Sequence, residues 1–195
     1  MRVVLASGNR GKLQELSSLL GPLGYDLVSQ ADLGIAAGPE TGATFIENAL
    51  QKARFASRQA NLPAIADDSG LVVDALGGAP GIRSARYAGP SADAEANNAK
   101  LLHELAGTSN RTAHFYCALV FIQSPDDPAP KVATGSWPGV ILEAPRGSGG
   151  FGYDPLFFVP SSGCAAAELE PSEKNRLSHR GQAVRELCEQ LKVRA

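Results

Sequence analysis

The chain has 195 residues, of which 44% are hydrophobic and 19% charged, and its formal net charge is -2. This length supports one sizeable hydrophobic core, and we expect a single domain over residues 1–195. The composition excludes an intrinsically disordered chain, and the charge gives no reason to expect a nucleic-acid polymer or an anionic membrane as partner.

The cysteines and the N-terminus indicate the compartment. The three cysteines are odd in number and lack the spacing of a zinc site, which favours a reducing environment. The first apolar run is too short for a signal peptide, and no stretch of about 18 apolar residues occurs anywhere in the chain. We therefore expect a cytoplasmic protein without a membrane-spanning segment.

The first predicted elements are a strand over residues 3–6, a glycine loop over residues 7–12 and a helix with leucines at helical spacing. Such a loop aims backbone N–H groups and a helix N-terminus at one point, and Lys12 adds a positive charge. The arrangement therefore suits a phosphate. The glycine spacing is not that of a P-loop, and the loop alone is weak evidence for a nucleotide site.

A short strand at residues 25–29 is followed by a loop with glycine and proline that carries Glu40. Thr44 and Glu47 then match a capping box, so a helix should begin there and run to about Arg58. Glu47 is interpreted as the partner of the cap. Glu40 lies in the loop and is freer to bind a ligand.

Two adjacent carboxylates, Asp67 and Asp68, stand in the middle of the chain. The apolar runs 64–66 and 71–73 predict two strands, with residues 67–70 as the connection between them. Because neighbouring residues of an extended chain point to opposite faces, the two carboxylates should have different roles. The local pattern fits either a plain turn or a functional pair, and by itself favours the turn.

The second half predicts a helix followed by a β-hairpin. We expect the helix over residues 92–106, and the two strands of the hairpin over residues 112–123 and 132–142. The second strand should be broken near Trp137, where proline and glycine follow. His114 fits a half-buried position in the sheet better than a ligand position.

Two later segments have the residue types of a ligand site. A glycine-rich run surrounds Phe151 and Tyr153, and their rings either stack on a planar base or anchor the loop. Lys174, His179 and Arg180 precede the final predicted helix. They form either a solvated basic cluster or a set of donors to a phosphate or a base edge.

Five separated segments occur in order along nearly the whole chain: SGNRGK, ETGATFIENA, ADDSGLVVDALGGAPGIRSARYAG, GGFGYDPLF and SHRGQA. Together they closely resemble the inosine triphosphate pyrophosphatase family, the Ham1-like nucleotide house-cleaning enzymes. The resemblance spans roughly residues 3–190. Ser7 stands where relatives often carry Thr, which keeps the hydroxyl group.

The resemblance implies hydrolysis of non-canonical purine nucleoside triphosphates such as ITP, dITP and XTP, with Mg²⁺, to the monophosphate and pyrophosphate. The fold that it implies is α/β and elongated. A long central mixed β-sheet is flanked by helices, and two lobes surround a substrate cleft. The family is usually homodimeric, so the resemblance also implies a homodimer.

The same resemblance assigns the residues of the site, motif by motif. Asp68 would be the catalytic residue and would hold Mg²⁺ together with Glu40. Whether Asp68 is a base, a metal ligand or both stays open. The residues that would bind the nucleotide are Ser7, Gly8, Asn9, Arg10, Gly11, Lys12, Ser69, Phe151, Gly152, Tyr153, Asp154, Lys174, His179 and Arg180.

Other functions compete with this one. A nucleotide-binding sensor would use the same residues without turnover, but a pure binder gains nothing from a water-activating carboxylate beside the phosphate. A relative of the Maf-like pyrophosphatases would act on pyrimidine nucleotides instead. An aspartyl-phosphate phosphatase is disfavoured, because that chemistry needs Asp-x-Asp and this chain has Asp67-Asp68-Ser69.

Overall fold

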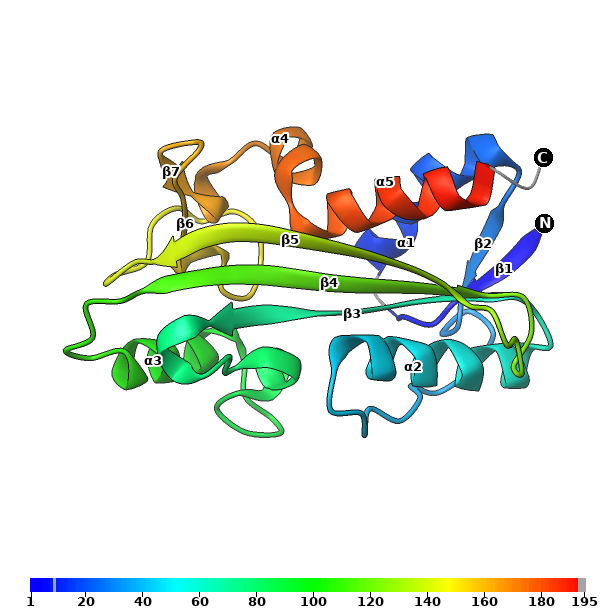
Figure 1. The fold of residues 1–195 in the computed structure, drawn as a ribbon, viewed down its shortest axis with the longest axis horizontal. Helices are drawn as coiled ribbons and strands as arrows, with labels where there is room; N and C mark the ends of the chain where they lie inside the picture. Colours follow the sequence, from blue (N-terminus) through cyan, green and yellow to red (C-terminus); the bar gives the residue numbers. More distant parts are fainter. Residues whose placement is uncertain (9, 193–195) are drawn as a thin grey trace. The chain divides into compact units, whose positions relative to one another are not determined.

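The computed structural model describes residues 1–8 and 10–192 and contains an open β-sheet with helices on both faces (Figure 1). The strands are hydrogen-bonded in the order β2-β1-β3-β4-β5-β6-β7. Their bounds are β1 Arg2–Leu5, β2 Asp26–Ser29, β3 Ala64–Val73, β4 Thr112–Ile122, β5 Lys131–Ile141, β6 Phe157–Val159 and β7 Cys164–Ala165. Strand β1 is parallel to β2 and β3, whereas β6 is antiparallel to β5 and β7. The predicted α/β class and mixed sheet are confirmed.

The helices alternate with the strands along the chain. The α-helices are α1 Arg10–Leu20, α2 Phe45–Ala60, α3 Ala94–Glu104, α4 Pro171–Leu177 and α5 His179–Lys192. The 3-10 helices are η1 Gly21–Leu23, η2 Asp74–Leu76, η3 Gly81–Arg86, η4 Asp154–Leu156 and η5 Ala166–Glu168. No helix in the described part of the chain is long and apolar enough to cross a membrane.

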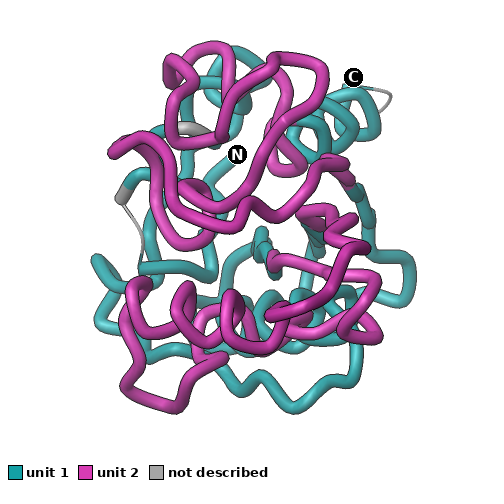
Figure 2. The backbone as a smooth tube through the Cα atoms, turned by 90° about the vertical axis from the view of Figure 1, so that its left-hand side faces the viewer, with its two compact units in different colours: residues 1–68, 117–134, 182–195 teal, residues 69–116, 135–181 magenta. Residues whose placement is uncertain are grey.

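The chain divides into two compact units (Figure 2). Unit 1 comprises residues 1–68, 117–134 and 182–195, and unit 2 comprises residues 69–116 and 135–181. Strands β3, β4 and β5 and helix α5 contribute residues to both units. The single-domain interpretation stays a prediction.

Unit 1 has a core between the sheet and two helices. Val3 and Leu5 alternate along β1 and so point to the same face, where they pack with Leu16 of α1 and Leu187 of α5. Helix α2 lies on the opposite face of the sheet in this unit (Figure 1). It begins at the predicted capping box, in which Thr44 accepts from the Glu47 N–H and the Glu47 carboxylate accepts from the Thr44 N–H.

Unit 2 has its own, aromatic core. The ring of Phe115 on β4 lies 4.5 Å from that of Phe157 on β6 and 6.3 Å from that of Trp137 on β5. Helix α3 begins at Asp93, whose carboxylate accepts from the Ala96 N–H. The helix is shorter than predicted at both ends, but its position in the chain is confirmed.

Strand β3 runs without interruption from Ala64 to Val73, so the turn predicted at residues 67–70 is wrong. Asp, Ser and Gly are frequent in turns, but that preference is local and weak compared with the pairing of a central strand. Asp67 and Asp68 tolerate burial in the strand because each is paired with a lysine of unit 1.

Strand β5 is also continuous, and the break predicted near Trp137 is wrong. The pairing with β6 covers Val140 and Ile141 and does not extend to Pro138, so the missing N–H of that proline costs no bond to β6. Gly139 is required, because an added Cβ would lie 2.5 Å from the ring of Phe157.

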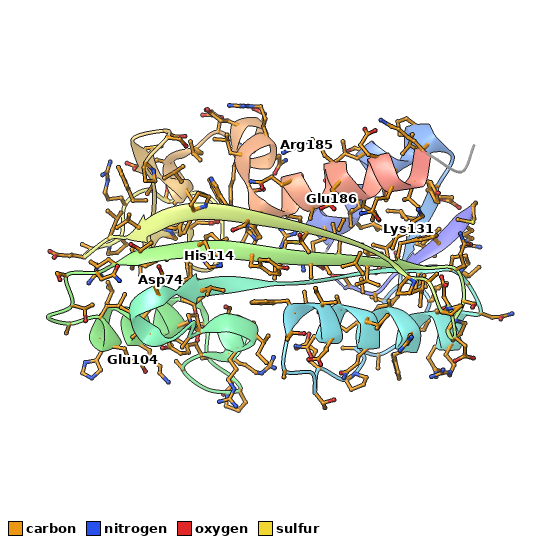
Figure 3. The ribbon with its side chains drawn as sticks, viewed as in Figure 1. Asp74, Glu104, His114, Lys131, Arg185 and Glu186 are labelled. Carbon is orange, nitrogen blue, oxygen red and sulfur yellow. The ribbon has the colours of Figure 1, made fainter. Side chains whose placement is uncertain are left out.

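The hairpin and its histidine agree with the sequence. Strands β4 and β5 are neighbours in the sheet, as predicted. His114 is half-buried on β4, which confirms its predicted sheet position (Figure 3). The final helix begins earlier than expected, because His179 and Arg180 are the first two residues of α5 and do not precede it. The Ser178 hydroxyl accepts the N–H of Gly181 at 3.2 Å at the start of this helix.

Candidate functional site

The glycine loop of unit 1 joins the end of β1 to the start of α1. The carbonyl of Ser7 accepts the hydroxyl of Ser29 at 2.9 Å, which ties the loop to the end of β2. Gly8 and Gly11 are exposed. Asn9 lies outside the described residues, as does the side chain of Arg10, with which α1 begins.

Lys12 reaches from α1 to the first carboxylate of β3. Its Nζ lies 2.8 Å from Oδ1 and 2.7 Å from Oδ2 of Asp67, whose side chain is buried. Charged hydrogen bonds of this kind are stronger than neutral ones. Asp67 therefore fixes the Lys12 ammonium at the start of α1, beside the glycine loop.

Asp68 is engaged from the other face of the sheet, by helix α2. Lys52 Nζ donates to its Oδ1 at 2.8 Å, and Asn48 Nδ2 donates to its Oδ2 at 3.3 Å. The same Lys52 ammonium lies 3.1 Å from Oε1 of Glu40. Asp67 and Asp68 thus bind different helices on opposite faces, which confirms the orientation expected from the extended chain (Figure 1).

The pKa of Asp68 is raised above its ordinary value, chiefly because burial penalises the carboxylate. The charge of Lys52 opposes this effect without cancelling it, while Glu40 adds repulsion. Burial by itself would lower the pKa of Lys52, but Asp68, Asp67 and Glu40 together hold it above its ordinary value. The Lys52 ammonium contacts two carboxylates and also feels the charge of Asp67, so it is the better compensated partner. Burial and the charge of Glu40 thus disfavour the ionised form of Asp68.

The donor set of unit 1 fits a hard divalent cation. Glu40 and Asp68 converge on one point, now held by the Lys52 ammonium. Within the described ranges, no group of three or more His, Cys, Asp or Glu side chains is placed to hold a metal. Mg²⁺ uses one or two protein carboxylates and fills its shell with water and substrate phosphates. Two carboxylates are therefore sufficient for that ion.

Sequence reasoning missed Asn48 and Lys52 as parts of this site. Asn48 is buried, donates to Asp68 and accepts the N–H of Gly42 at 2.8 Å. Their i, i+4 spacing places both on one face of α2. That spacing, beside alanines on the same helix, is the feature of the sequence that could have indicated a shared site. The unit 1 cluster consists of Lys12, Glu40, Asn48, Lys52, Asp67 and Asp68.

In unit 2, Phe151 is 62% exposed, which is rare for so large an apolar ring. Lys174 Nζ lies 4.6 Å from the centre of the ring, and Arg180 Cζ lies 5.7 Å from it. Both distances are typical of cation–π contacts. The ring and two cations thus form one surface that suits a flat, hydrogen-bond-accepting ligand.

Asp154 organises the loop beneath that surface. Its buried Oδ2 accepts the N–H of Phe151 at 2.7 Å and also binds the Lys174 ammonium. A Cβ on Gly150 would lie 2.2 Å from this oxygen, and Gly150 has φ +73°, so only glycine fits there. The glycine-rich sequence therefore serves the close packing of this carboxylate.

Tyr153 and Gly152 are each hydrogen-bonded to other elements of unit 2. The Tyr153 ring is buried, and its hydroxyl donates to the Ser84 carbonyl at 2.8 Å. The Gly152 carbonyl accepts from Asn98 Nδ2 of α3 at 3.0 Å. Tyr153 therefore anchors the loop, whereas Phe151 is exposed, and its stacking on a base stays a prediction. Ser69 is half-buried on β3.

His179 is buried at the start of α5 against the aromatic core. Its ring is stacked on Phe115, with centroids 4.9 Å apart and planes at 12°, and lies 6.5 Å from Trp137. Sequence reasoning did not connect these rings, because His179 lies on α5, far along the chain from β4 and β5. The unit 2 cluster consists of Phe151, Asp154, Lys174, His179 and Arg180.

Known proteins are similar to this chain over nearly its whole length. A model of the Ham1 family matches residues 3–190. A dITP/XTP pyrophosphatase of Ralstonia nicotianae is 57% identical over 98% of this chain and 97% of its own length. One from Escherichia coli K12 is 56% identical over 98% of each chain. The solved structure of a HAM1 protein from Coxiella burnetii is 47% identical, with a TM-score of 0.95 over 98% of each chain.

Proposed function

The chain belongs to the Ham1 family, and we propose that it is a pyrophosphohydrolase of non-canonical purine nucleoside triphosphates such as ITP, dITP and XTP. It releases the monophosphate and pyrophosphate and so removes these nucleotides from the pool. The observation that carries the proposal is the buried Asp68, held by Lys52 and Asn48, in a chain 57% identical to a dITP/XTP pyrophosphatase.

The unit 1 cluster performs the chemistry at the phosphates. Asp68 accepts a proton from the water that attacks the α-phosphorus, and its raised pKa favours that role. Lys12 and the N–H groups at the start of α1 bind the phosphate oxygens. Glu40 and Asp68 would hold Mg²⁺, and the ion would supply positive charge at the leaving pyrophosphate.

The unit 2 cluster recognises the base. Phe151 stacks on the purine, and Lys174, His179 and Arg180 donate hydrogen bonds toward its polar edge. Hypoxanthine and xanthine carry an oxygen at position 6, whereas adenine carries an amino group. The guanidinium of Arg180 can only donate hydrogen bonds, so it pairs with the oxygen at position 6. In adenine it would meet the amino group, which is also a donor. Sites of this kind reject the wrong group by about 10⁴-fold.

The remaining proposals concern the state of the protein in the cell. We propose that it is a cytoplasmic homodimer that acts on free nucleotides and not on nucleic acid or membranes. All three cysteines are thiols, which supports a reducing compartment. Light scattering after size-exclusion chromatography tests the dimer, and a mass of about 20 kDa would contradict it (the chain is 20.3 kDa).

Product identification tests the reaction. The purified protein is incubated with Mg²⁺ and ITP, dITP, XTP, GTP, ATP or a pyrimidine triphosphate, and the products are separated by ion-exchange chromatography. Monophosphate and pyrophosphate, without free phosphate, are expected from the first three. Binding without turnover indicates the sensor, a preference for pyrimidines indicates Maf-like chemistry, and equal rates for ATP and ITP contradict the house-cleaning assignment.

A further inference from the structure

The ammonium of Lys52 stands between the two carboxylates to which the metal is assigned. Its Nζ lies 2.8 Å from Asp68 Oδ1 and 3.1 Å from Glu40 Oε1. The Lys52 side chain is only 13% exposed, compared with 33% for Glu40. The Glu40 and Asp68 carboxylates therefore share one cation, the ammonium of Lys52.

The local sequence enforces this position. The capping box fixes the first turn of α2, and Asn48 and Lys52 follow on the same face one turn apart. Asn48 donates to Asp68 and at the same time accepts the N–H of Gly42, two residues after Glu40. Gly42 has no room for a side chain, because a Cβ would lie 2.6 Å from that of Glu47. The helix thus holds both the ammonium and the loop that carries Glu40.

A divalent cation bound by the same oxygens conflicts with the ammonium. A Mg²⁺ ion held by Glu40 and Asp68 would use carboxylate oxygens that the Lys52 ammonium already contacts at 3.1 and 2.8 Å. Two cations that contact the same oxygens repel strongly at a partly buried site. The two cations can coexist only if the lysine turns toward an anion, and a triphosphate is the anion that the reaction supplies.

We propose that Lys52 is a positioning residue that holds Glu40 and Asp68 in place of the metal until the nucleotide arrives. This inference rests on the proposed function. In the nucleotide-free protein the ammonium keeps the carboxylates together and excludes divalent ions. When the triphosphate binds, the ammonium turns to its oxygens and the carboxylates take the metal. Metal and nucleotide therefore bind cooperatively, each raising the affinity of the other by the same factor.

The test measures binding of Mn²⁺, as a paramagnetic substitute for Mg²⁺, by electron paramagnetic resonance of the free ion. It uses the wild type, Lys52→Met and the control Lys192→Met, with and without an ITP analogue that has a methylene group between the α- and β-phosphorus atoms. The control removes the same charge from an exposed pair with Glu189. Without nucleotide, Lys52→Met should bind Mn²⁺ on the order of 5- to 150-fold more tightly than the wild type, the usual range of such coupling.

The analogue gives the second readout. After correction for the Mn²⁺ that the analogue chelates in a sample without protein, it should tighten Mn²⁺ binding to the wild type and to Lys192→Met. The effect on Lys52→Met should be much smaller, because the competing cation is already gone. An ion pair with a merely structural role changes stability and leaves this coupling intact. Lys52→Gln is measured in parallel, and the wild-type coupling needs no variant, so a poorly folded Lys52→Met does not prevent a decision.

Equal Mn²⁺ affinities of Lys52→Met and the wild type without nucleotide overturn the proposal, as does a wild type whose Mn²⁺ affinity ignores the analogue. A different result points to the proposed function itself. If Mn²⁺ binds with the analogue but Asp68→Asn binds it equally well, the metal does not use Asp68, and the assignment of the site fails together with this inference.

Discussion

In unit 1 the carboxylates and ammonium groups are buried against one another, whereas in unit 2 the cations of Lys174 and Arg180 lie over the exposed ring of Phe151. A buried pair depends on both partners, because removal of one leaves an uncompensated charge. A cation over a ring is individually weak but sensitive to the shape and polarity of what stacks there. Substitutions in unit 1 should therefore change the rate, and those in unit 2 should change the choice of base.

The largest effect is expected for Asp68→Asn. The amide keeps the shape and the contact with Lys52 but loses the negative charge, so turnover of ITP should fall by ~10²- to 10⁴-fold, as for a lost general base. The measurement is kcat at saturating Mg²⁺, with circular dichroism to confirm folding. Asp67→Asn is the matched comparison and should lose less activity, because Asp67 binds Lys12 on the other face. A variant Asp68→Asn that keeps more than about a tenth of the activity would refute the assignment.

The second-largest effect is expected for the choice between ITP and ATP. Arg180→Ala should reduce the ratio of kcat/KM for ITP to that for ATP by about 10²-fold or more, because the donor that rejects the 6-amino group is lost. Lys12→Ala should slow both nucleotides alike and leave the ratio near that of the wild type, since an ammonium is a point charge suited to phosphate. A ratio that changes in Lys12→Ala and not in Arg180→Ala would reverse the roles of the two units.

A smaller effect is expected at the exposed ring. Phe151→Leu keeps apolar bulk but loses both the stacking face and the cation–π contacts, and should raise KM for ITP by about tenfold, consistent with about 1–3 kcal/mol per stacked base. Phe151→Tyr keeps an aromatic face, so its KM for ITP should stay close to that of the wild type. The kcat of both variants should stay close to that of the wild type. A fall in kcat with an unchanged KM would mean that the ring supports the chemistry and does not bind the base.

The sequence predicted the fold where a pattern is local and failed where tertiary context decides. The capping box at Thr44 and Glu47, and the long apolar run of β4, are set by neighbouring residues and were found. The sequence predicted two strands in place of β3, with a turn at its aspartates. The lysines that neutralise these aspartates in the sheet lie 55 and 16 residues away in the chain. Nothing in the local pattern reveals such partners.

The candidate site shows the same division. The carboxylates and basic residues were found because their motifs resemble those of a family, but the resemblance names residues and not their contacts. The sequence does not single out Lys52, and its contact with Asp68 appears only when α2 is placed against β3. Phe115 and Trp137 are core residues, and their rings also stack with that of His179. That role depends on packing of α5 against the β4–β5 hairpin, which lies far away in the sequence.

The last and smallest effect concerns pH and separates the two units once more. Burial raises the pKa of Asp68, and the charge of Lys52 lowers it in part. A base must be ionised, so kcat/KM falls as the pH drops through this pKa, and removal of the opposing cation lets the pKa rise further. The acid limb of the profile of Lys52→Gln should therefore lie at higher pH than that of the wild type. Lys174→Gln, in unit 2, should leave the limb in place while it raises KM. A limb that moves to lower pH in Lys52→Gln, or moves equally in both variants, would show that Asp68 is not the group whose ionisation limits the reaction.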